Sequence, residues 1–224
     1  MTMFRFCEIE PERVPNNIRY EESRQGVITN NYFLPLIRNE YEAVQEITGG
    51  KFAQLYNCNN PSADRSFGFG GIGVVNGQVN SLFLDRFDLK ELSPTIKQLT
   101  HLRDLNLPYN QLVYLPDEIY GLQELRRLIL NNNQLTMISP RIKNLSHLDM
   151  FIISNNKLTH LTDEIGELSE LMYLDIRGNQ LETLPQNLKN LLEKESVYVR
   201  QNPYNKQTLN LLKRLEKKKG FTFI

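Results

Sequence analysis

The chain has 224 residues, 40% of them apolar and 23% charged, and its 26 Lys and Arg residues balance 26 Asp and Glu residues. A neutral chain lacks the basic excess that neutralises phosphates, which argues against a nucleic acid or a membrane surface as its partner. No apolar run approaches the roughly 18 residues of a transmembrane helix. The first residues also lack the apolar stretch of a signal peptide, so we expect a cytoplasmic protein in which Cys7 and Cys58 are free thiols.

Residues 1–30 form the first predicted segment and carry the weakest structural signals. Residues 3–9 are compatible with a strand, and residues 11–26 are charged and resemble a loop. We therefore expect at most one strand here, followed by a mobile stretch.

Residues 31–78 are predicted to form an N-terminal cap that consists of a helix and a hairpin. Four apolar residues recur with the spacing of one helix face, and they are Ile37, Tyr41, Val44 and Ile47. Gly49-Gly50 ends this pattern. Asn76-Gly77 then separates two apolar runs, which is a strong signal for a tight hairpin. This hairpin is expected to pair with the first strand of the next region and to protect its edge.

The region from residue 79 to residue 203 repeats with a period of 23 residues. Of the 34 leucines in the chain, 31 lie at or after Leu82. Five complete units and a truncated sixth begin at Val79, Leu102, Leu125, Leu148, Leu171 and Lys194. Positions 1, 4, 6, 11, 14, 18 and 21 are apolar in every complete unit. Such self-similarity predicts a stack of identical structural units.

Apolar residues at positions 4 and 6 of each unit alternate with polar ones, which predicts a short strand. One such strand cannot bury its apolar face alone, so the units are expected to stack into a continuous parallel sheet with a shared core. Position 9 is Asn in every unit after the first, at Asn110, Asn133, Asn156, Asn179 and Asn202. These amides are predicted to form a buried structural ladder that bonds the backbone of their own turn and of the next unit. The first unit has Phe87 at this position.

These columns resemble the leucine-rich repeat family, with the pattern L-x-x-L-x-L-x-x-N-x-L followed by x-x-L-P-x-x-I-x-x-L. The unit 102–124 matches throughout and carries Pro116 in the proline column. The resemblance implies a curved α/β solenoid, a horseshoe segment with a parallel concave sheet, capped at both ends. The unit length is similar to that of the intracellular class, which includes Ras-suppressor-like, Scribble-like and many microbial proteins. It implies a non-enzymatic scaffold or signalling module that binds proteins, with a small GTPase or its regulator as one partner.

Residues 204–224 are predicted to form a C-terminal capping helix and strand. Asn205 can cap a helix that runs to about Lys219, with Leu209, Leu212 and Leu215 on one face. The alternating residues 221–224 predict a final strand.

Residues 68–73 fit the glycine pattern of dinucleotide sites, but strand and turn residues follow where such a site needs a helix. His101 and His147 occupy the same column two units apart, too far to share a metal ion without a third group. Asp117-Glu118 and Asp163-Glu164 recur on the convex side, where solvated turns are expected. We therefore predict no cofactor, no metal and no catalytic site. The alternative is an enzyme or regulatory protein whose activity resides in residues 1–78, with the repeats as a recognition arm.

Positions 2, 3, 5, 7 and 8 of each unit should point away from the core, on the concave face. Their apolar members fall on adjacent strands, where an exposed apolar patch rimmed by charge indicates an interface. The predicted partner-binding residues are Tyr109, Arg126, Arg127, Ile129, Met150, Ile152, Met172, Tyr173, Asp175 and Tyr198.

Overall fold

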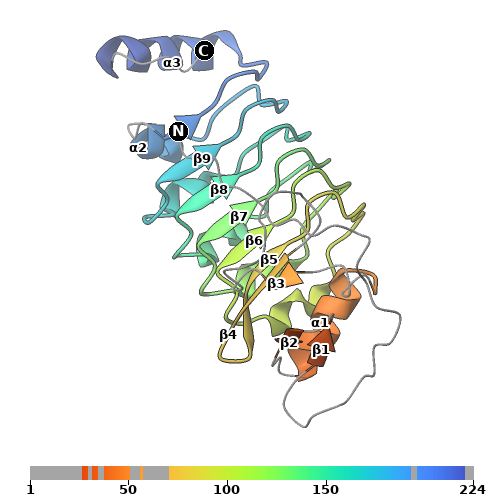
Figure 1. The fold of residues 1–224 in the computed structure, drawn as a ribbon. Helices are drawn as coiled ribbons and strands as arrows, with labels where there is room; N and C mark the ends of the chain where they lie inside the picture. Colours follow the sequence, from red (N-terminus) through yellow and green to blue (C-terminus); the bar gives the residue numbers. More distant parts are fainter. Residues whose placement is uncertain are drawn as a thin grey trace.

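The structure is a computed structural model that describes residues 27–29, 32–34, 38–50, 56–57, 71–192 and 196–219. Figure 1 shows an elongated coil in which short strands stack along one face and loops return behind them. None of the described helices is long and apolar enough to cross a bilayer.

Eight strands form one sheet in the order β10-β9-β8-β7-β6-β5-β4-β3. The strands are β3 (Tyr56–Asn57), β4 (Gly71–Val75), β5 (Gln78–Phe83), β6 (Asp104–Asn106), β7 (Arg127–Ile129), β8 (Met150–Ile152), β9 (Tyr173–Asp175) and β10 (Val197–Tyr198). Strands β5 to β10 are parallel, and residues 23 apart stand side by side, as Leu82, Leu105 and Leu128 do. This register confirms the predicted solenoid with its parallel sheet.

The predicted apolar columns fill the core behind the sheet. Leu82, Leu105 and Leu128 at position 4 are fully buried, and only Leu115 and Leu184 at position 14 remain partly exposed. The convex layer is formed by short 3-10 helices and one helical turn, which are η3 (Pro94–Gln98), η4 (Asp117–Gly121), η5 (Pro140–Asn144), η6 (Asp163–Glu167), η7 (Gln186–Leu188) and α2 (Lys189–Leu192).

The position-9 asparagines form a buried ladder, and Asn156 shows its geometry. Its Nδ2 donates to the carbonyls of Leu130 and Ile153 at 3.0 Å each, and its Oδ1 accepts from the Leu135 N–H at 2.9 Å. Leu130 and Leu135 belong to the preceding unit, so the prediction of bonds to the next unit is wrong. In a parallel sheet the N–H and C=O of one residue point to the same side, and at position 6 both point toward the strand of the following unit. The position-6 carbonyl therefore accepts its bond from the asparagine of the following unit, so each asparagine bonds the unit before its own.

Replacing Asn156 with Ala should lower the free energy of unfolding by about 1–3 kcal/mol, because buried backbone groups of Leu130 and Leu135 lose their partner. Denaturant unfolding measures this, with the exposed Lys157→Ala as the control. An Asn156→Ala protein that unfolds at the same midpoint as the parent would show that the ladder is not structural.

The hairpin predicted at Asn76-Gly77 is confirmed, since β4 and β5 are antiparallel and both turn residues have positive φ, 52° and 78°. Its second strand, β5, is itself the strand of the first repeat. Gly73 in β4 allows a close approach, because a Cβ there would lie 2.6 Å from Asn80 Oδ1. Gly68 and Gly70 of the glycine pattern lie outside the described residues.

Helix α1 (Arg38–Ile47) covers the N-terminal end of the core with Ala43, Val44 and Ile47. It ends as predicted, with Gly49 and Gly50 at positive φ. Ahead of it, β1 (Val27–Thr29) and β2 (Tyr32–Leu34) form a separate antiparallel pair. The strand and loop expected in residues 3–26 lie outside the described part of the chain.

Glu40 ties α1 to the first repeat. It is 2% exposed, and its Oε2 accepts a 2.7 Å hydrogen bond from the Val79 N–H. Burial raises the pKa of the Glu40 carboxyl, and the bond from Val79 and the charge of His101 oppose that shift. The folded state therefore holds this proton more tightly than the unfolded state does, and stability contributed by Glu40 falls as pH rises through the raised pKa.

A Glu40→Gln variant should be at least as stable as the parent at pH 7, because the amide still accepts from Val79 without a buried charge. The difference in stability between Glu40→Gln and the parent should vanish at pH values below the ordinary Glu pKa, where Glu40 is protonated in both the folded and the unfolded state. Glu40→Leu should lower the free energy of unfolding by about 1–3 kcal/mol, because it leaves the buried Val79 N–H without an acceptor. Thermal melts across this pH range test both variants, and a Glu40→Gln protein much less stable at neutral pH would contradict the account.

At the other end, helix α3 (Lys206–Lys219) lies across the last unit (Figure 1). Asn205 Oδ1 accepts from the Thr208 N–H at 2.9 Å, which confirms the predicted cap residue, and Leu212 and Leu215 are buried. Tyr204 was not predicted. Its hydroxyl donates to the Val199 carbonyl at 2.9 Å, where an asparagine of a further unit would otherwise bond. The strand expected at residues 221–224 lies outside the described residues.

Candidate protein-binding surface

Five of the predicted partner-binding residues come together on the concave face, and we call them the concave patch: Ile129, Met150, Ile152, Met172 and Tyr173. Ile129 stands beside Ile152, and Met150 stands beside Tyr173, in the parallel register. Met172 is 65% exposed, and the other four side chains are half-buried. The core is complete without these side chains, so the patch is apolar surface that folding does not require.

Aromatic rings extend the concave patch toward the C-terminal end. The rings of Tyr173 and Tyr198 lie with their centroids 5.1 Å apart, and the Arg177 guanidinium lies 5.1 Å from the Tyr198 centroid. Burial raises the pKa of the Tyr173 hydroxyl, and the charge of Asp175 adds to that effect. Both tyrosines are amphipathic aromatic side chains, a residue type enriched at protein interfaces.

Asp175, which was predicted to contact a partner, is only 3% exposed. Its carboxylate accepts two bonds from Arg177, at 2.9 and 2.7 Å, and one from the Arg177 N–H. Arg177 follows two residues later and reaches back over the strand end. Asp175 thus offers a partner little surface and instead holds Arg177 in place beside Tyr198.

The predicted arginines flank the concave patch and are already paired. Arg127 makes a two-pronged contact with Asp104, with one bond of 2.7 Å, and Arg126 lies 3.9 Å from Glu170. Tyr109 is placed elsewhere, in the turn after β6 with a φ of 54°, and its ring packs under Arg86 at 4.2 Å. The structure therefore does not bring Tyr109 into the patch.

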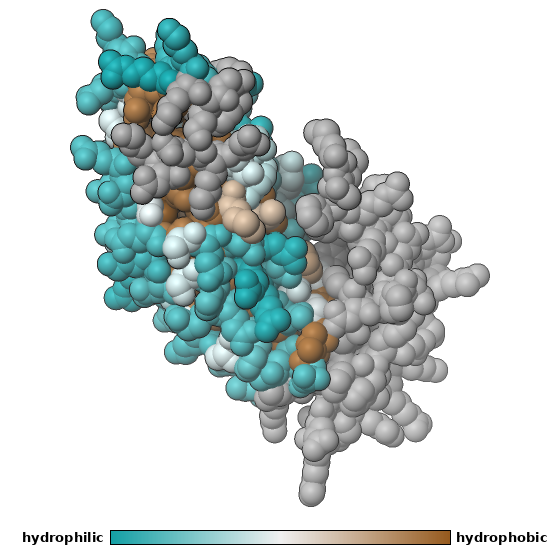
Figure 2. Space-filling view, turned by 90° about the vertical axis from the view of Figure 1, so that its left-hand side faces the viewer, coloured by the Kyte–Doolittle hydropathy of each residue, from teal (hydrophilic) through white to brown (hydrophobic). Residues whose placement is uncertain are grey.

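The flank from which the strands start carries the charged residues. His147 Nδ1 lies 2.9 Å from Glu170, and Arg103 lies 2.9 Å from Glu124. Figure 2 shows this side as largely hydrophilic, with a hydrophobic area toward the C-terminal end. Within the described ranges, no group of three His, Cys, Asp or Glu side chains is arranged to hold a metal ion.

Two surface features escaped the sequence analysis. Val113, Tyr114 and Met137 are 44%, 51% and 61% exposed at repeat positions 12 and 13. The only signal was their apolar character in columns that are otherwise mostly polar.

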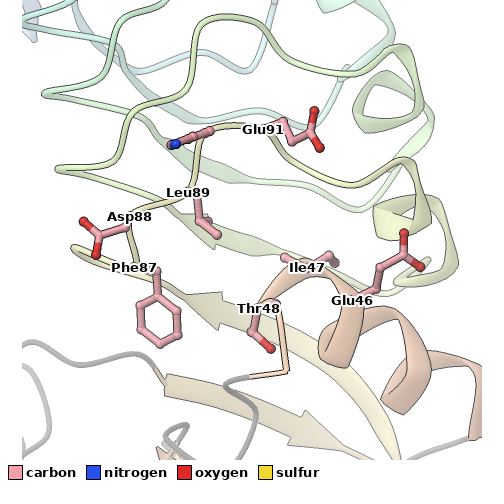
Figure 3. A pocket seen from close by; sticks show the side chains of 9 residues that line it. Glu46, Ile47, Thr48, Phe87, Asp88, Leu89 and Glu91 are labelled. Carbon is pink, nitrogen blue, oxygen red and sulfur yellow. The ribbon is translucent and has the colours of Figure 1, made fainter.

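The second feature is an open cavity of about 540 Å³ between the end of α1 and the first repeat turn (Figure 3). Ile47, Phe87 and Leu89 give it apolar walls. Glu46 accepts a 2.6 Å bond from the Ser93 hydroxyl, and Thr48 donates to a backbone carbonyl of its own helix at 2.8 Å. Both polar groups already have partners, and the bond between Glu46 and Ser93 joins the helix to the first repeat.

Comparisons with known proteins agree with this geometry. A sequence model described as leucine rich repeat matches residues 77–135 and 123–181. No curated protein matches the chain significantly in sequence. A leucine-rich repeat protein of Leptospira interrogans shares 34% identity over 58% of this chain, with a TM-score of 0.55. This chain spans only 33% of that structure's length.

Two Arabidopsis thaliana structures show the same fold at lower identity. The ectodomain of the receptor kinase SOBIR1 shares 23% identity, with a TM-score of 0.56, and covers 75% of this chain and 94% of its own. The BIR3–SERK2 complex includes a chain that shares 21% identity, with a TM-score of 0.57. That match covers 74% of this chain and 93% of the other. Residues 77–181 of this chain are therefore leucine-rich repeats, and its fold is the leucine-rich repeat solenoid.

Proposed function

We propose that this protein is a non-enzymatic module that binds a protein partner through the concave patch. The observation that supports this most is the run of apolar side chains on three adjacent strands, β7, β8 and β9, on the face that does not pack the core. Repeat solenoids present such faces to partners. The matched family points to an interaction module and to no enzymatic activity.

The same proposal includes a scaffold or regulatory role in the cytoplasm. A small GTPase or its regulator is the partner suggested by the resemblance to Ras-suppressor-like proteins. The BIR3–SERK2 structure contains a neighbour of this fold in a complex with another protein, which supports protein binding in general and not this choice of partner.

Tyr173→Ala tests the proposal at the centre of the patch. Loss of a half-buried interfacial aromatic should weaken binding by about 1–2 kcal/mol, or roughly 5–30-fold. The partner is first captured with the wild-type chain and then titrated with the variant. Glu118→Ala in η4, on the convex side, is the control and should bind normally. Normal binding by Tyr173→Ala together with loss in Glu118→Ala would place the interface elsewhere.

A further inference from the structure

The charges on the concave face are paired in a consistent way, with one exception. Five arginines each lie within 4.0 Å of a different carboxylate, in the pairs Arg86–Asp85, Arg103–Glu124, Arg126–Glu170, Arg127–Asp104 and Arg177–Asp175. Asp149 is the carboxylate on this face that has no hydrogen bond or ion pair with any described residue.

Asp149 stands directly beside the concave patch. It precedes Met150 at the start of β8, and its backbone carbonyl accepts from the N–H groups of Met172 and Tyr173 at 2.9 and 3.0 Å. Its side chain is half-buried, and burial raises the pKa of its carboxyl, while Arg127 and Arg126 at longer range lower it. A partly desolvated carboxylate without a bonding partner favours a cation brought to it.

The arginines each lie beside a carboxylate: Arg103, Arg127 and Arg177 donate hydrogen bonds to theirs, and Arg126 lies 3.9 Å from Glu170. An anionic partner would compete with those carboxylates for the arginines, whereas a cationic partner meets the unpaired carboxylate of Asp149.

We propose that the concave patch takes a polypeptide segment in which a Lys or Arg side chain stands beside a large apolar one. The cation pairs with Asp149, and the apolar side chain packs on Ile152 and Tyr173. This inference rests on the proposed function and specifies the chemistry of the partner.

The experiment uses a phage-displayed library of random linear peptides, panned on the full chain. The wild type should enrich peptides with Lys or Arg next to Phe, Tyr, Leu, Ile or Met. Asp149→Asn should keep the apolar preference and lose the basic one, and Asp149→Lys should favour acidic neighbours instead. Position 2 holds Arg126 in the preceding unit, so a basic residue fits the fold there. Glu118→Gln, a matched carboxylate-to-amide change on the convex side, should select the same peptides as the wild type.

A synthetic peptide of the enriched sequence should bind Asp149→Asn about tenfold more weakly than the wild type. Enrichment without basic residues, identical pools from the wild type and Asp149→Asn, or no enrichment at all would overturn the inference. If peptides without a charge preference still lose binding to Ile152→Asp, this inference fails and the proposed function stands. If selected peptides bind Ile152→Asp as well as the wild type, the proposed function fails too.

Discussion

The Ile152→Asp variant is expected to lose its protein partner and to keep its fold. Ile152 is half-buried at the centre of the concave patch and stands between Ile129 and Asp175. An aspartate there would be buried unpaired beneath a partner, which should cost on the order of 3 kcal/mol or more, or at least about 100-fold in affinity.

The fold should tolerate Ile152→Asp, because the core columns do not include this residue. Loss of about half an isoleucine's burial and a strand-unfavourable side chain should cost about 1–2 kcal/mol. For a chain of this size that lowers the melting temperature by roughly 2–8 °C. Ile152→Val is the matched control and should bind and melt like the parent. Binding by Ile152→Asp within about threefold of the wild type would remove the patch from the interface.

Removal of the C-terminal cap should have the largest effect on stability. A chain truncated after Asn202 loses Tyr204, whose hydroxyl bonds the Val199 carbonyl, and the buried Leu212 and Leu215 of α3. Exposing the surface that two leucines covered costs about 3–6 kcal/mol, a large share of the total for an ordinary domain. The uncovered end of the solenoid should also aggregate.

Thermal unfolding and light scattering measure this effect, and two substitutions in α3 separate it from simple loss of chain length. Leu212→Asp should behave like the truncation, whereas Lys213→Asp, at an exposed position, should not. A truncated chain that stays monomeric and melts like the full chain would show that α3 does not act as the cap.

The repetitive parts of the fold follow from the sequence, because one unit specifies every other. The period of 23, the column of asparagines and the turn at Asn76-Gly77 each depend on local residues that act in the same way wherever they occur. The C-terminal helix likewise follows from Asn205 and its apolar face. Each of these features is determined by residues that are neighbours in the chain or that occupy equivalent positions in the repeats.

The features that the sequence analysis missed depend on particular side-chain contacts within one unit or between neighbouring units. The pairing of Arg127 with Asp104 and the burial of Asp175 under Arg177 result from side-chain conformations that no repeat pattern specifies. The bond from Tyr204 to Val199 forms only because the stack ends there. These same side-chain conformations decide which charges the concave face leaves unpaired, and the chemistry that we propose for the partner is argued from them.

Hydrogen–deuterium exchange of the captured complex tests most directly whether the concave face is the binding surface. The account predicts that the partner slows exchange in β7, β8 and β9, that is, in Arg127–Ile129, Met150–Ile152 and Tyr173–Asp175, and leaves the convex helices η4 to η6 unchanged. Protection confined to the convex helices or to α1, with unchanged exchange in β7 to β9, would contradict it.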